Sequence, residues 1–524
     1  MKLRYLAALA AGLALIGAVV MMTRGGSPAG GTARTIVVGL SADIATFEPA
    51  NISSRDNMNI AHHIFASLFT LDADGKHVPN LAREMTVSED GLAYTYTLRD
   101  GLTCHDGEAL TAEDVAYSFT RIADPANKFT GNAPGFVFSS IGFRGAEALD
   151  PQHVRITIAR KNPIAFGLLT EISIHCKDSY EKMSLDQAAT SPIGSGPYRL
   201  VSWSRGSEIV LEKVGEAAVA YDRIVWRIIP EASTRAAELM AGNVDIIANV
   251  APDQIAAINA SNVAAVQSVT STRRMFVGFN QAEQFATTAG GRAIRDAKVR
   301  RALQYAVDVP TICRQLLQVE CQRATGLVNA VNANKMLTPY PFEPATAERL
   351  LDEAGWPRVG GRMRFAITLQ AGRGRYLNDV NVVQAIGQYL RDVGVDVNVE
   401  LLEWASVFQP LLRTRTAGPL FFMGTGGGLW SPIYDMNDLA RVDSGTNYAN
   451  WADERWFSRW DALTAAATPE DTRRIVDEML QIFYDDGPWL HLYFQPDFYG
   501  VSSRVEWKAR PDERIYAYDA RPKG

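Results

Sequence analysis

The fold class follows from residues 365–401, which read FAITLQAGRGRYLNDVNVVQAIGQYLRDVGVDVNVEL. Residues 365–369 predict a strand. In residues 379–393 apolar side chains recur at spacings of three and four, which predicts a helix that Gly394 ends. Residues 395–401 then alternate apolar and polar side chains, which predicts a strand with one wet face. A strand, a helix and a strand with so long a crossover imply parallel pairing, so the class is α/β.

Other segments extend this pattern toward the N-terminus. Strands are predicted at Thr35–Leu40, 94–99 and 154–159, where β-branched and aromatic residues are dense. Thr111 is predicted to cap a helix, with Asp114 three residues on as the partner acid. A further helix with one buried face is predicted at 295–308 from its apolar spacing.

Length and composition limit the classes of protein that the chain can belong to. Its 524 residues exceed what one hydrophobic core serves, so two or three compact units are expected. With 47% hydrophobic and 21% charged residues, the composition is that of a globular protein and excludes a polytopic membrane protein. The 52 basic and 58 acidic residues give a net charge of -6, so we expect no nucleic acid as partner.

The N-terminus has the pattern of an export signal. Lys2 and Arg4 precede an apolar run at 6–22, and small residues at 27–29 suit a signal peptidase, so residues 1–29 are predicted to be a signal peptide. The run also reaches the lower limit of roughly 17–25 residues that span a bilayer, so a retained N-terminal membrane anchor stays open. No cysteine lies near it for a lipid. A periplasmic location follows as the expectation.

The four cysteines allow two disulfides in an exported chain. Cys313 and Cys321 lie eight residues apart and suit one bridge, and Cys104 with Cys176 suits a second. Four buried thiols are the alternative. Their spacing fits no zinc pattern.

The sequence lacks the common catalytic motifs, so we predict that the protein is not an enzyme. The sequence holds no G-x-S-x-G, no H-E-x-x-H and no Walker motif. His62 and His63 are adjacent, so on a helix they would face different directions. The glycine-rich stretch 424–428 precedes no helical pattern that could present amides to a phosphate. We therefore predict no catalytic residue, no metal and no cofactor.

Aromatic residues beside glycine and proline point instead to binding. They are Trp404, Trp430, Tyr434, Trp489, Tyr493 and Phe494, all in apparent loops. Large amphipathic rings at strand ends suit a ligand cleft, since open α/β sheets bind ligands there. Packing in the core is the alternative for each of them.

Blocks in a fixed order give the chain a resemblance to a known family. They are LRDGLTCHDGEALTAEDVAYS at 98–118, GSGPY at 194–198, FN at 279–280, VRRALQYAVD at 299–308 and YPFEPATAERLLDEAGW at 340–356. Together they resemble the peptide/nickel-type extracytoplasmic solute-binding proteins of ABC importers, solute-binding family 5. The likeness extends over about residues 35–520.

The resemblance implies the type II periplasmic-binding-protein fold, with two lobes, a hinge and an extra small domain. We name the implied parts by residue range. Lobe I comprises 30–64, 190–274 and 485–524, the insert is 65–189, and lobe II is 275–484.

The resemblance also implies ligand positions. The candidate ligand-binding residues, including one from the aromatic pattern, are Phe47, Glu48, Arg274, Met275, Trp404, Gly428, Trp430 and Tyr493. In peptide-binding members an aspartate neutralises the peptide's ammonium group, and Gly428 stands in its place here. That change costs on the order of 2–5 kcal/mol of peptide binding. Asp435, seven residues on, is a candidate substitute. A sugar, an opine or another amphiphile is therefore favoured over an ordinary peptide.

The resulting hypothesis is a monomeric periplasmic binding protein. It would close over a solute that touches both lobes and deliver it to an ABC permease in the inner membrane. Arg274 would hold an anionic group if it faces the cleft. Two alternatives stay open: a sensory or carrier protein without an importer, and a hydrolase with an unrecognised site.

Overall fold

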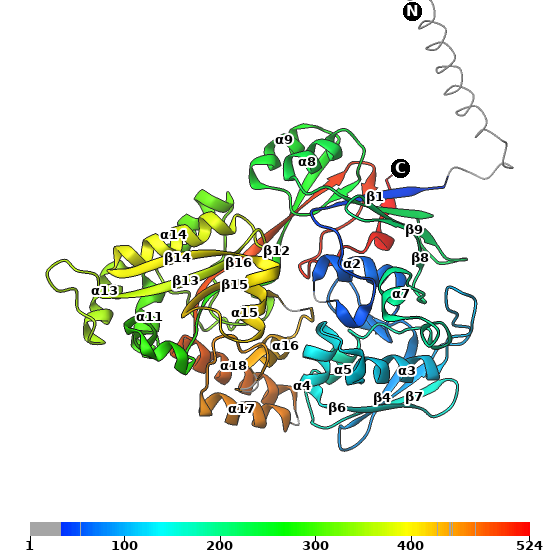
Figure 1. The fold of residues 1–524 in the computed structure, drawn as a ribbon, viewed down its shortest axis with the longest axis horizontal. Coiled ribbons are helices and arrows are strands. Elements are labelled where there is room, and N and C mark those ends of the chain that lie inside the picture. The colour runs from blue at the N-terminus through cyan, green and yellow to red at the C-terminus, as the bar shows by residue number, and fades with distance from the viewer. Residues whose placement is uncertain are drawn as a thin grey trace, which may run out of the picture.

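Two long strands connect the halves of the molecule. The computed structural model describes residues 33–523 except 53, 427, 440, 441, 443 and 467, and omits the side chains of 331 and 405, so the predicted signal peptide lies outside the described residues. Strands β12 (Ala264–Phe279) and β16 (Trp489–Ser502) pair antiparallel at the centre of a ten-stranded sheet. β12 runs from lobe I into lobe II, and the first residues of β16, which the sequence assigned to lobe I, pair with the lobe II end of β12 (Figure 1). Their register shifts on both sides of Arg274, which marks the crossing between lobes.

Lobe I holds one half of the large sheet. Its strands are β1 (Thr35–Leu40), β8 (Tyr198–Ser204), β9 (Glu208–Lys213), β10 (Arg223–Ile228) and β11 (Ile246–Ile247). Its α-helices are α2 (Arg55–Ile64), α8 (Ala232–Met240) and α9 (Ile255–Ala260). The predicted first strand is confirmed as β1, which pairs parallel with β10 and β11. The two-stranded β17 (Val505–Glu506) and β18 (Arg521–Pro522) lie near the C-terminus.

The insert is built around a separate four-stranded antiparallel sheet in the order β4-β5-β7-β6. Its strands are β2 (Phe69–Leu71), β3 (His77–Pro79), β4 (Ala82–Val87), β5 (Ala93–Leu98), β6 (Phe143–Ala148) and β7 (His153–Ile158). Its α-helices are α3 (Ala112–Ala123), α4 (Ser139–Ile141), α5 (Ala165–Leu169), α6 (Lys177–Tyr180) and α7 (Leu185–Thr190). The predicted cap is confirmed, because Thr111 and Asp114 form a capping box at the start of α3.

Lobe II carries the strand–helix–strand unit that set the fold class. Its strands are β13 (Phe365–Arg373), β14 (Val395–Glu403) and β15 (Leu420–Gly426). Its α-helices are α10 (Ala289–Ala293), α11 (Ala297–Tyr305), α12 (Val309–Ile312), α13 (Pro344–Glu353), α14 (Asp379–Asp392), α15 (Gln409–Arg413), α16 (Pro432–Met436), α17 (Glu454–Thr464) and α18 (Pro469–Asp486). The predicted parallel pairing of β13 with β14 is confirmed. Gly394 ends α14 at φ 91°, a conformation that favours glycine.

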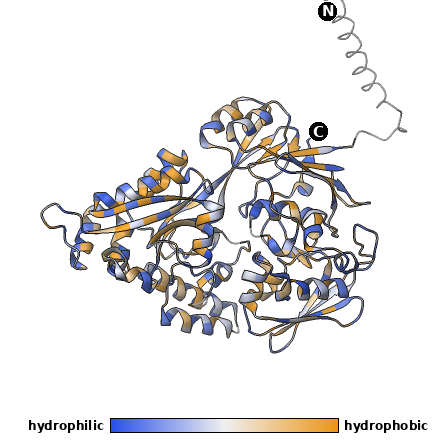
Figure 2. Cartoon of the chain, in the orientation of Figure 1, coloured by the Kyte–Doolittle hydropathy of each residue, from blue (hydrophilic) through white to orange (hydrophobic). Residues whose placement is uncertain are grey.

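One prediction about the aromatic segments is wrong. Trp489, Tyr493 and Phe494 lie inside the buried strand β16 and not in a loop. A central strand that is buried on both faces has no polar alternation to reveal it, and the preceding Gly487-Pro488 resembled a loop. Figure 2 shows hydrophobic residues along the strands in both halves of the molecule.

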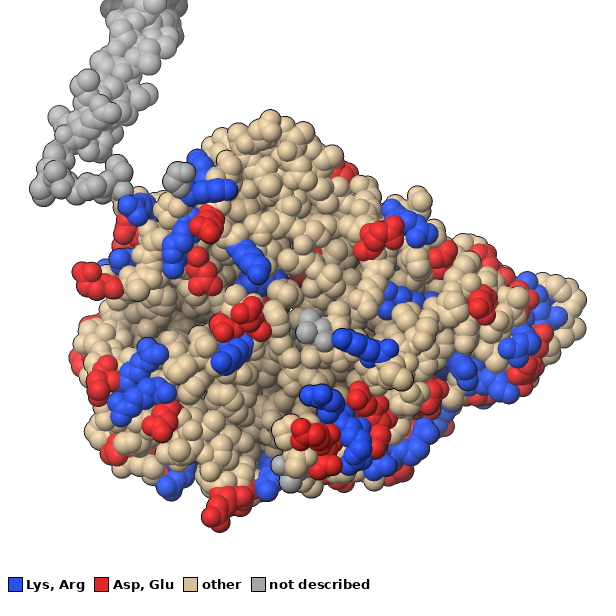
Figure 3. Space-filling view, turned by 180° about the vertical axis from the view of Figure 1, so that it is seen from behind, with Lys and Arg blue, Asp and Glu red and all other residues tan. Residues whose placement is uncertain are grey.

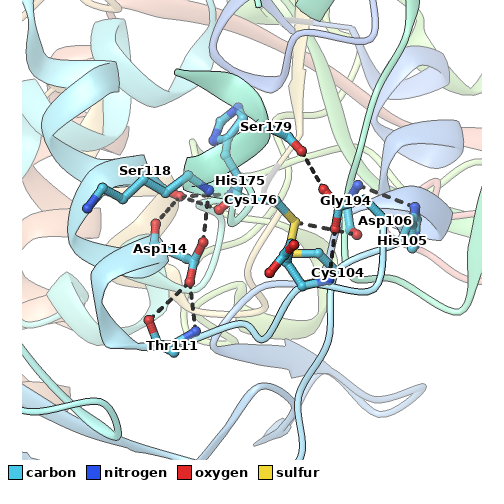
Figure 4. The surroundings of a disulfide bond; sticks show 12 residues. Cys104, His105, Asp106, Thr111, Asp114, Ser118, His175, Cys176, Ser179 and Gly194 are labelled. Atoms are coloured by element: carbon cyan, nitrogen blue, oxygen red, sulfur yellow. Dashed lines mark hydrogen bonds between the residues drawn. A yellow bond between two sulfur atoms is a disulfide. The ribbon is translucent and has the colours of Figure 1, made fainter. Parts of the chain in front are cut away.

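Both predicted cysteine pairings are present, and the structure joins Cys104 to Cys176 and Cys313 to Cys321. The first links the loop before α3 to the residue before α6, as Figure 4 shows. Next to it, the Lys177 backbone N–H donates to Asp114 at 2.8 Å. The bridge and the helix cap therefore fix the same corner of the insert.

We expect the two bridges to differ in their contribution to stability. They close loops of 72 and 8 residues, and loop closure in the unfolded chain costs more entropy for the longer loop. Replacing Cys104 and Cys176 by serine should therefore lower the free energy of unfolding by about 2 kcal/mol more than replacing Cys313 and Cys321. Urea denaturation of the two double variants measures this. Equal losses, or four free thiols in the unfolded, unreduced protein, would contradict it.

Two further findings concern membrane-spanning helices and surface charge. Over the part of the chain that is described, no helix combines the length and the apolar content needed to cross a bilayer. Acidic and basic side chains alternate over the face seen in Figure 3 and form no large patch of one sign there.

Candidate ligand-binding site

Apolar contacts join lobe II to the insert. The Trp430 ring lies so close to Gly75 that a Cβ there would come within 2.3 Å of the ring. Leu429 covers Gly167 in the same way, with 2.5 Å between a Cβ at Gly167 and the Leu429 Cδ1 atom. Only glycine allows so close an approach at these two points.

A polar contact holds the same two parts together. Asn437 of lobe II accepts a hydrogen bond from Asn162 at 3.2 Å and donates one to the Ser140 hydroxyl at 2.7 Å. The Phe136 and Tyr434 rings meet edge to face at 5.4 Å between centroids. Lobe II and the insert are therefore in direct contact through both apolar and polar side chains.

Charged side chains from all three parts gather where the lobes meet. We call this group the interlobe charge cluster, and it consists of Arg55, Asp56, Glu171, Arg273, Arg375, Glu513 and Arg514. Arg375 comes from lobe II, Glu171 from the insert and the others from lobe I. Arg273 is paired with Glu513 and Arg514 with Glu171, and Arg55 and Glu171 both lie beside Gly428. The arginines Arg55 and Arg375 both act to lower the pKa values of Asp56 and Glu513.

Arg514 links the three parts directly. Its guanidinium donates to the Glu171 carboxylate at 2.7 Å and to the Gly428 carbonyl at 3.3 Å. Burial alone would raise the pKa of Glu171, but Arg514 and Arg55 outweigh it and hold the pKa below its ordinary value. Glu171 is therefore ionised and committed to Arg514.

Arg273 and Glu513 form a two-pronged ion pair at the crossing strand. Two guanidinium nitrogens lie 2.7 Å from the two carboxylate oxygens, and a third donates to the Gly424 carbonyl at 3.3 Å. Burial raises the pKa of Glu513, yet Arg273 overrides it and brings the pKa to about 2. This pair stays ionised and does not need a solute to complete it.

Three members of the cluster lack such a partner. Among the described residues, the Asp56 carboxylate has no hydrogen bond or ion pair, and Arg55 contacts only the Met58 sulfur at 3.7 Å. The Arg375 guanidinium forms no ion pair there and lies 5.4 Å from the Tyr376 ring centre. All three charged side chains are half-buried, so each has surface left for a solute.

A small cavity lies beside the cluster. It has a volume of about 30 Å³, is lined by His62, Glu171 and Tyr434 among others, and has room for only a few water molecules. Burial lowers the pKa of His62 to about 3, with Arg514 acting in the same direction, so the ring is neutral.

Two predicted ligand residues lie at the cluster. The Trp404 indole is half-buried, 5.8 Å from the Arg375 guanidinium and 5.7 Å from the Tyr376 ring. At Gly428 a Cβ would lie 3.5 Å from an Arg55 nitrogen. The position that carries a carboxylate in peptide binders thus faces an arginine here. Trp430 lies at the same interface, against Gly75.

Phe47 and Glu48 do not join the cluster. Phe47 is fully buried in the core of lobe I, against Trp203 at 5.0 Å. Glu48 is buried and paired with Arg121 at 2.8 Å and His175 at 3.2 Å. Burial alone would raise its pKa, but these partners lower the pKa to about 2. No contact in the structure supports a role in binding for either residue.

Arg274, the last residue of the lobe I range, is paired with acidic residues of lobe II and is not free for a solute. Its guanidinium lies 2.9 Å from Asp435 and 3.5 Å from Asp438, and all but 1% of its side chain is buried. Asp435 also accepts hydrogen bonds from Asn329. Asp435 is therefore not free to replace the missing aspartate.

The remaining two predicted residues are also buried. Met275 packs beneath Gly424, and Tyr493 pairs through its backbone with Arg323. Sequence reasoning missed Arg55, Asp56, Arg375 and Arg514, because nothing in their local pattern distinguishes them from surface charges. In the described part of the chain, no group of three or more potential ligands could hold a metal ion.

Comparisons with known proteins agree on one family. Residues 76–447 match the model of the bacterial extracellular solute-binding proteins, family 5. The glutathione-binding protein GsiB of Salmonella typhimurium is 24% identical over 479 residues, which cover 88% of this chain and 89% of GsiB. GsiB of Escherichia coli O1:K1 is 25% identical over 480 residues, with the same coverage.

Solved structures show the same fold. The substrate-binding protein CtaP of an ABC transporter from Listeria monocytogenes superposes with a TM-score of 0.80 at 20% identity, covering 94% of this chain and 99% of CtaP. AgaA from A. tumefacien R10, solved with agropinic acid, gives 0.79 at 22% identity, with coverage of 94% and 99%. The chain therefore belongs to the family 5 bacterial extracellular solute-binding proteins, which are non-enzymatic components of ABC importers.

Proposed function

We propose that this protein captures an acidic, amino-acid-derived solute between its lobes and delivers it to an ABC permease. One observation carries the proposal: Arg55 of lobe I and Arg375 of lobe II belong to one cluster, and neither has a carboxylate partner among the described residues. A guanidinium at a half-buried site is suited to a carboxylate, which it can bind through two parallel hydrogen bonds. A solute acid would supply the partner that the protein does not.

The relatives' names support this class of compound. GsiB is named for glutathione, and AgaA was solved with agropinic acid. Both compounds are acids that derive from amino acids, and the second is an opine. An opine-like acid or a small acidic peptide derivative fits the cluster better than a sugar, because a sugar would leave both arginines without a counter-charge.

Closure of the lobes supplies the mechanism. A solute held by Arg55 and Arg375 contacts both lobes only when they are closed, so its binding favours the closed state. The crossing strands β12 and β16 carry the hinge, and their register shifts beside Arg274 interrupt the regular ladder at that point. A dissociation constant in the micromolar range, about -8 kcal/mol, would suffice for such a carrier.

The cellular setting is part of the same proposal. Residues 1–29 would direct export to the periplasm, by cleavage or as a retained anchor. The protein would act as a monomer, and the closed lobes together would form the surface that the permease recognises.

Calorimetric titration with a panel of solutes tests the proposed class. The panel would hold glutathione, an opine acid, an acidic dipeptide and a neutral disaccharide. We expect at least one acid to bind with micromolar affinity and to be recovered unchanged, while the disaccharide does not bind. Binding of the disaccharide alone, or conversion of a bound acid, would contradict the proposal.

Replacing Trp404 by alanine should weaken binding of that acid at least tenfold. The indole lies beside Arg375 at the cluster, so its removal takes away apolar contact area and a ring next to the guanidinium. The matched control is Trp203→Ala, which removes a half-buried ring that packs against Phe47 in lobe I and should leave the affinity unchanged. Titration of both variants, with thermal unfolding to confirm folding, decides the point. An unchanged affinity for Trp404→Ala would remove this residue from the site.

A further inference from the structure

A groove between the insert and lobe II lies outside the interlobe charge cluster. Its volume of about 790 Å³ is within the range of roughly 300–1,000 Å³ that is typical of pockets for small molecules. The insert wall comes from α4 and from the segment after β7, and the lobe II wall comes from α17, which lies beside α4 in Figure 1. None of the described residues that line the groove belongs to the cluster. A molecule held here would therefore occupy a second site.

Two buried amide side chains join the walls of this groove. Asn162 donates to the Asn437 carbonyl oxygen at 3.2 Å, and Asn437 donates to the Ser140 hydroxyl at 2.7 Å. The carbonyl oxygen of Asn162 accepts from the Ile164 backbone N–H at 3.0 Å. These amides are engaged in holding the two parts together, so recognition of a ligand falls to the side chains of the walls.

The insert wall carries two positive charges. The Arg160 guanidinium donates to the Ser139 carbonyl at 2.6 Å and lies over Gly142, where a Cβ would come within 3.3 Å of its central carbon. Lys161 follows it along the same wall. Within the described residues, neither Arg160 nor Lys161 forms an ion pair, and both are exposed. The wall thus presents a positioned guanidinium and an ammonium without counter-charges.

The lobe II wall carries two aromatic rings. Phe457 and Trp460 are three residues apart in α17 and so share one face of the helix. Phe457 is half-buried, and neither ring packs against another aromatic ring in the described part of the chain. Asp461 is the one acid among the described residues that line the groove, against two cations. The groove therefore combines an apolar aromatic wall with a wall that favours an anion.

We propose that this groove is a second binding site, which takes an aromatic organic acid. The acid group would bind Arg160 and Lys161 of the insert, and the ring would lie against Phe457 and Trp460 of lobe II. A guanidinium binds a carboxylate through two parallel N–H···O bonds, and aromatic rings gain contact energy from a neighbouring ring in offset or edge-to-face geometry. A neutral compound of the same shape would lack the first of these interactions.

A ligand in the groove would touch the insert and lobe II at once. It makes all its contacts only while the two parts lie together, so its binding favours that arrangement. On the basis of the function proposed above, the transported solute favours the same arrangement. Each ligand should then strengthen the binding of the other by the same factor. The groove would in this way adjust the affinity of the interlobe site.

Calorimetric titration with naphthylacetate and its neutral amide, naphthylacetamide, tests the second site. The wild-type protein should bind the acid at least tenfold more tightly than the amide. Arg160→Gln should weaken binding of the acid at least tenfold and change binding of the amide less than threefold, while Phe457→Ala should weaken both. Arg155→Gln is the matched control, because it removes an exposed arginine of the insert that pairs with Glu147 and does not line the groove. It should leave both affinities unchanged.

A variant of the interlobe site shows which site the probe occupies. Trp404→Ala should leave the affinity for naphthylacetate unchanged. If Trp404→Ala weakens it and Arg160→Gln does not, the acid binds at the interlobe cluster, which overturns the groove site and leaves the proposed function intact. Absence of binding, or equal binding of the acid and the amide, would also overturn the groove site.

The coupling between the two sites has its own measurement. Saturation with an acid whose affinity depends on Trp404 should tighten the binding of naphthylacetate at least threefold. An unchanged affinity would overturn the coupling, while the Arg160→Gln result would still decide whether the groove binds an aromatic acid.

Discussion

Replacing Gly167 by leucine should weaken solute binding at least a hundredfold. Gly167 lies in α5 of the insert, where even a Cβ would approach the Leu429 Cδ1 atom of lobe II to 2.5 Å and His77 to 3.4 Å. A leucine adds three more carbons to the same contact. The larger side chain would hold the lobes apart and so remove the contacts that only the closed state makes.

The insert itself should tolerate this substitution. Leucine favours a helix more than glycine does, by about 1 kcal/mol, so the unliganded protein should remain folded. Gly135→Leu is the matched control, since a Cβ at this exposed position of the insert meets nothing within 4 Å. Titration of both variants with the acid that binds the wild type gives the comparison. Wild-type affinity in Gly167→Leu would show that the observed lobe contact is not needed for binding.

Replacing Arg274 by methionine should lower the free energy of unfolding by about 3–5 kcal/mol. The substitution leaves the buried carboxylates of Asp435 and Asp438 without their cation. Burial already raises the pKa of Asp435, and loss of the opposing Arg274 would raise it further. The folded variant would therefore take up protons at Asp435 that the unfolded chain releases.

The pH dependence of this loss has a defined sign. A carboxyl group whose pKa is higher in the folded protein than in the unfolded chain binds more protons in the folded state. The free energy of unfolding therefore falls as the pH rises above the pKa of the unfolded chain. Arg274→Met should therefore be closest to the wild type near pH 5 and lose most near pH 8. Arg199→Met, which breaks the exposed pair with Glu212, is the control and should cost no more than about 1 kcal/mol. Urea denaturation at both pH values measures this, and a pH-independent loss below 1 kcal/mol in Arg274→Met would contradict it.

Local patterns were enough to predict much of the fold. The unit from β13 to β14 was predictable because the period of the helix, the glycine at its end and the alternation of the next strand are all written within 40 consecutive residues. The capping box at Thr111 is equally local. The strand β16 was not recognised, because its apolar run has no period.

The site was harder to predict, for a physical reason. Arg55, Asp56, Arg375 and Arg514 come from segments far apart in the chain and come together only in the folded molecule. Each is ordinary in its own sequence context. Phe47 and Glu48 were proposed from the family likeness, but a ligand-facing loop depends on which way its side chains turn. Here Phe47 turns into the core of lobe I, and Glu48 turns toward Arg121 of the insert.

The most direct test of the account is the distance between the lobes with and without solute. Spin labels at Val87→Cys in the insert and Val359→Cys in lobe II, both exposed positions, would report it, and labels at Val87→Cys and Leu149→Cys within the insert would serve as control. We predict that a saturating acid shortens the first distance, leaves the second unchanged and is released intact on denaturation. An unaltered distance between the lobes at saturation, or a chemically altered acid, would contradict the claim that this protein works by closing over a solute.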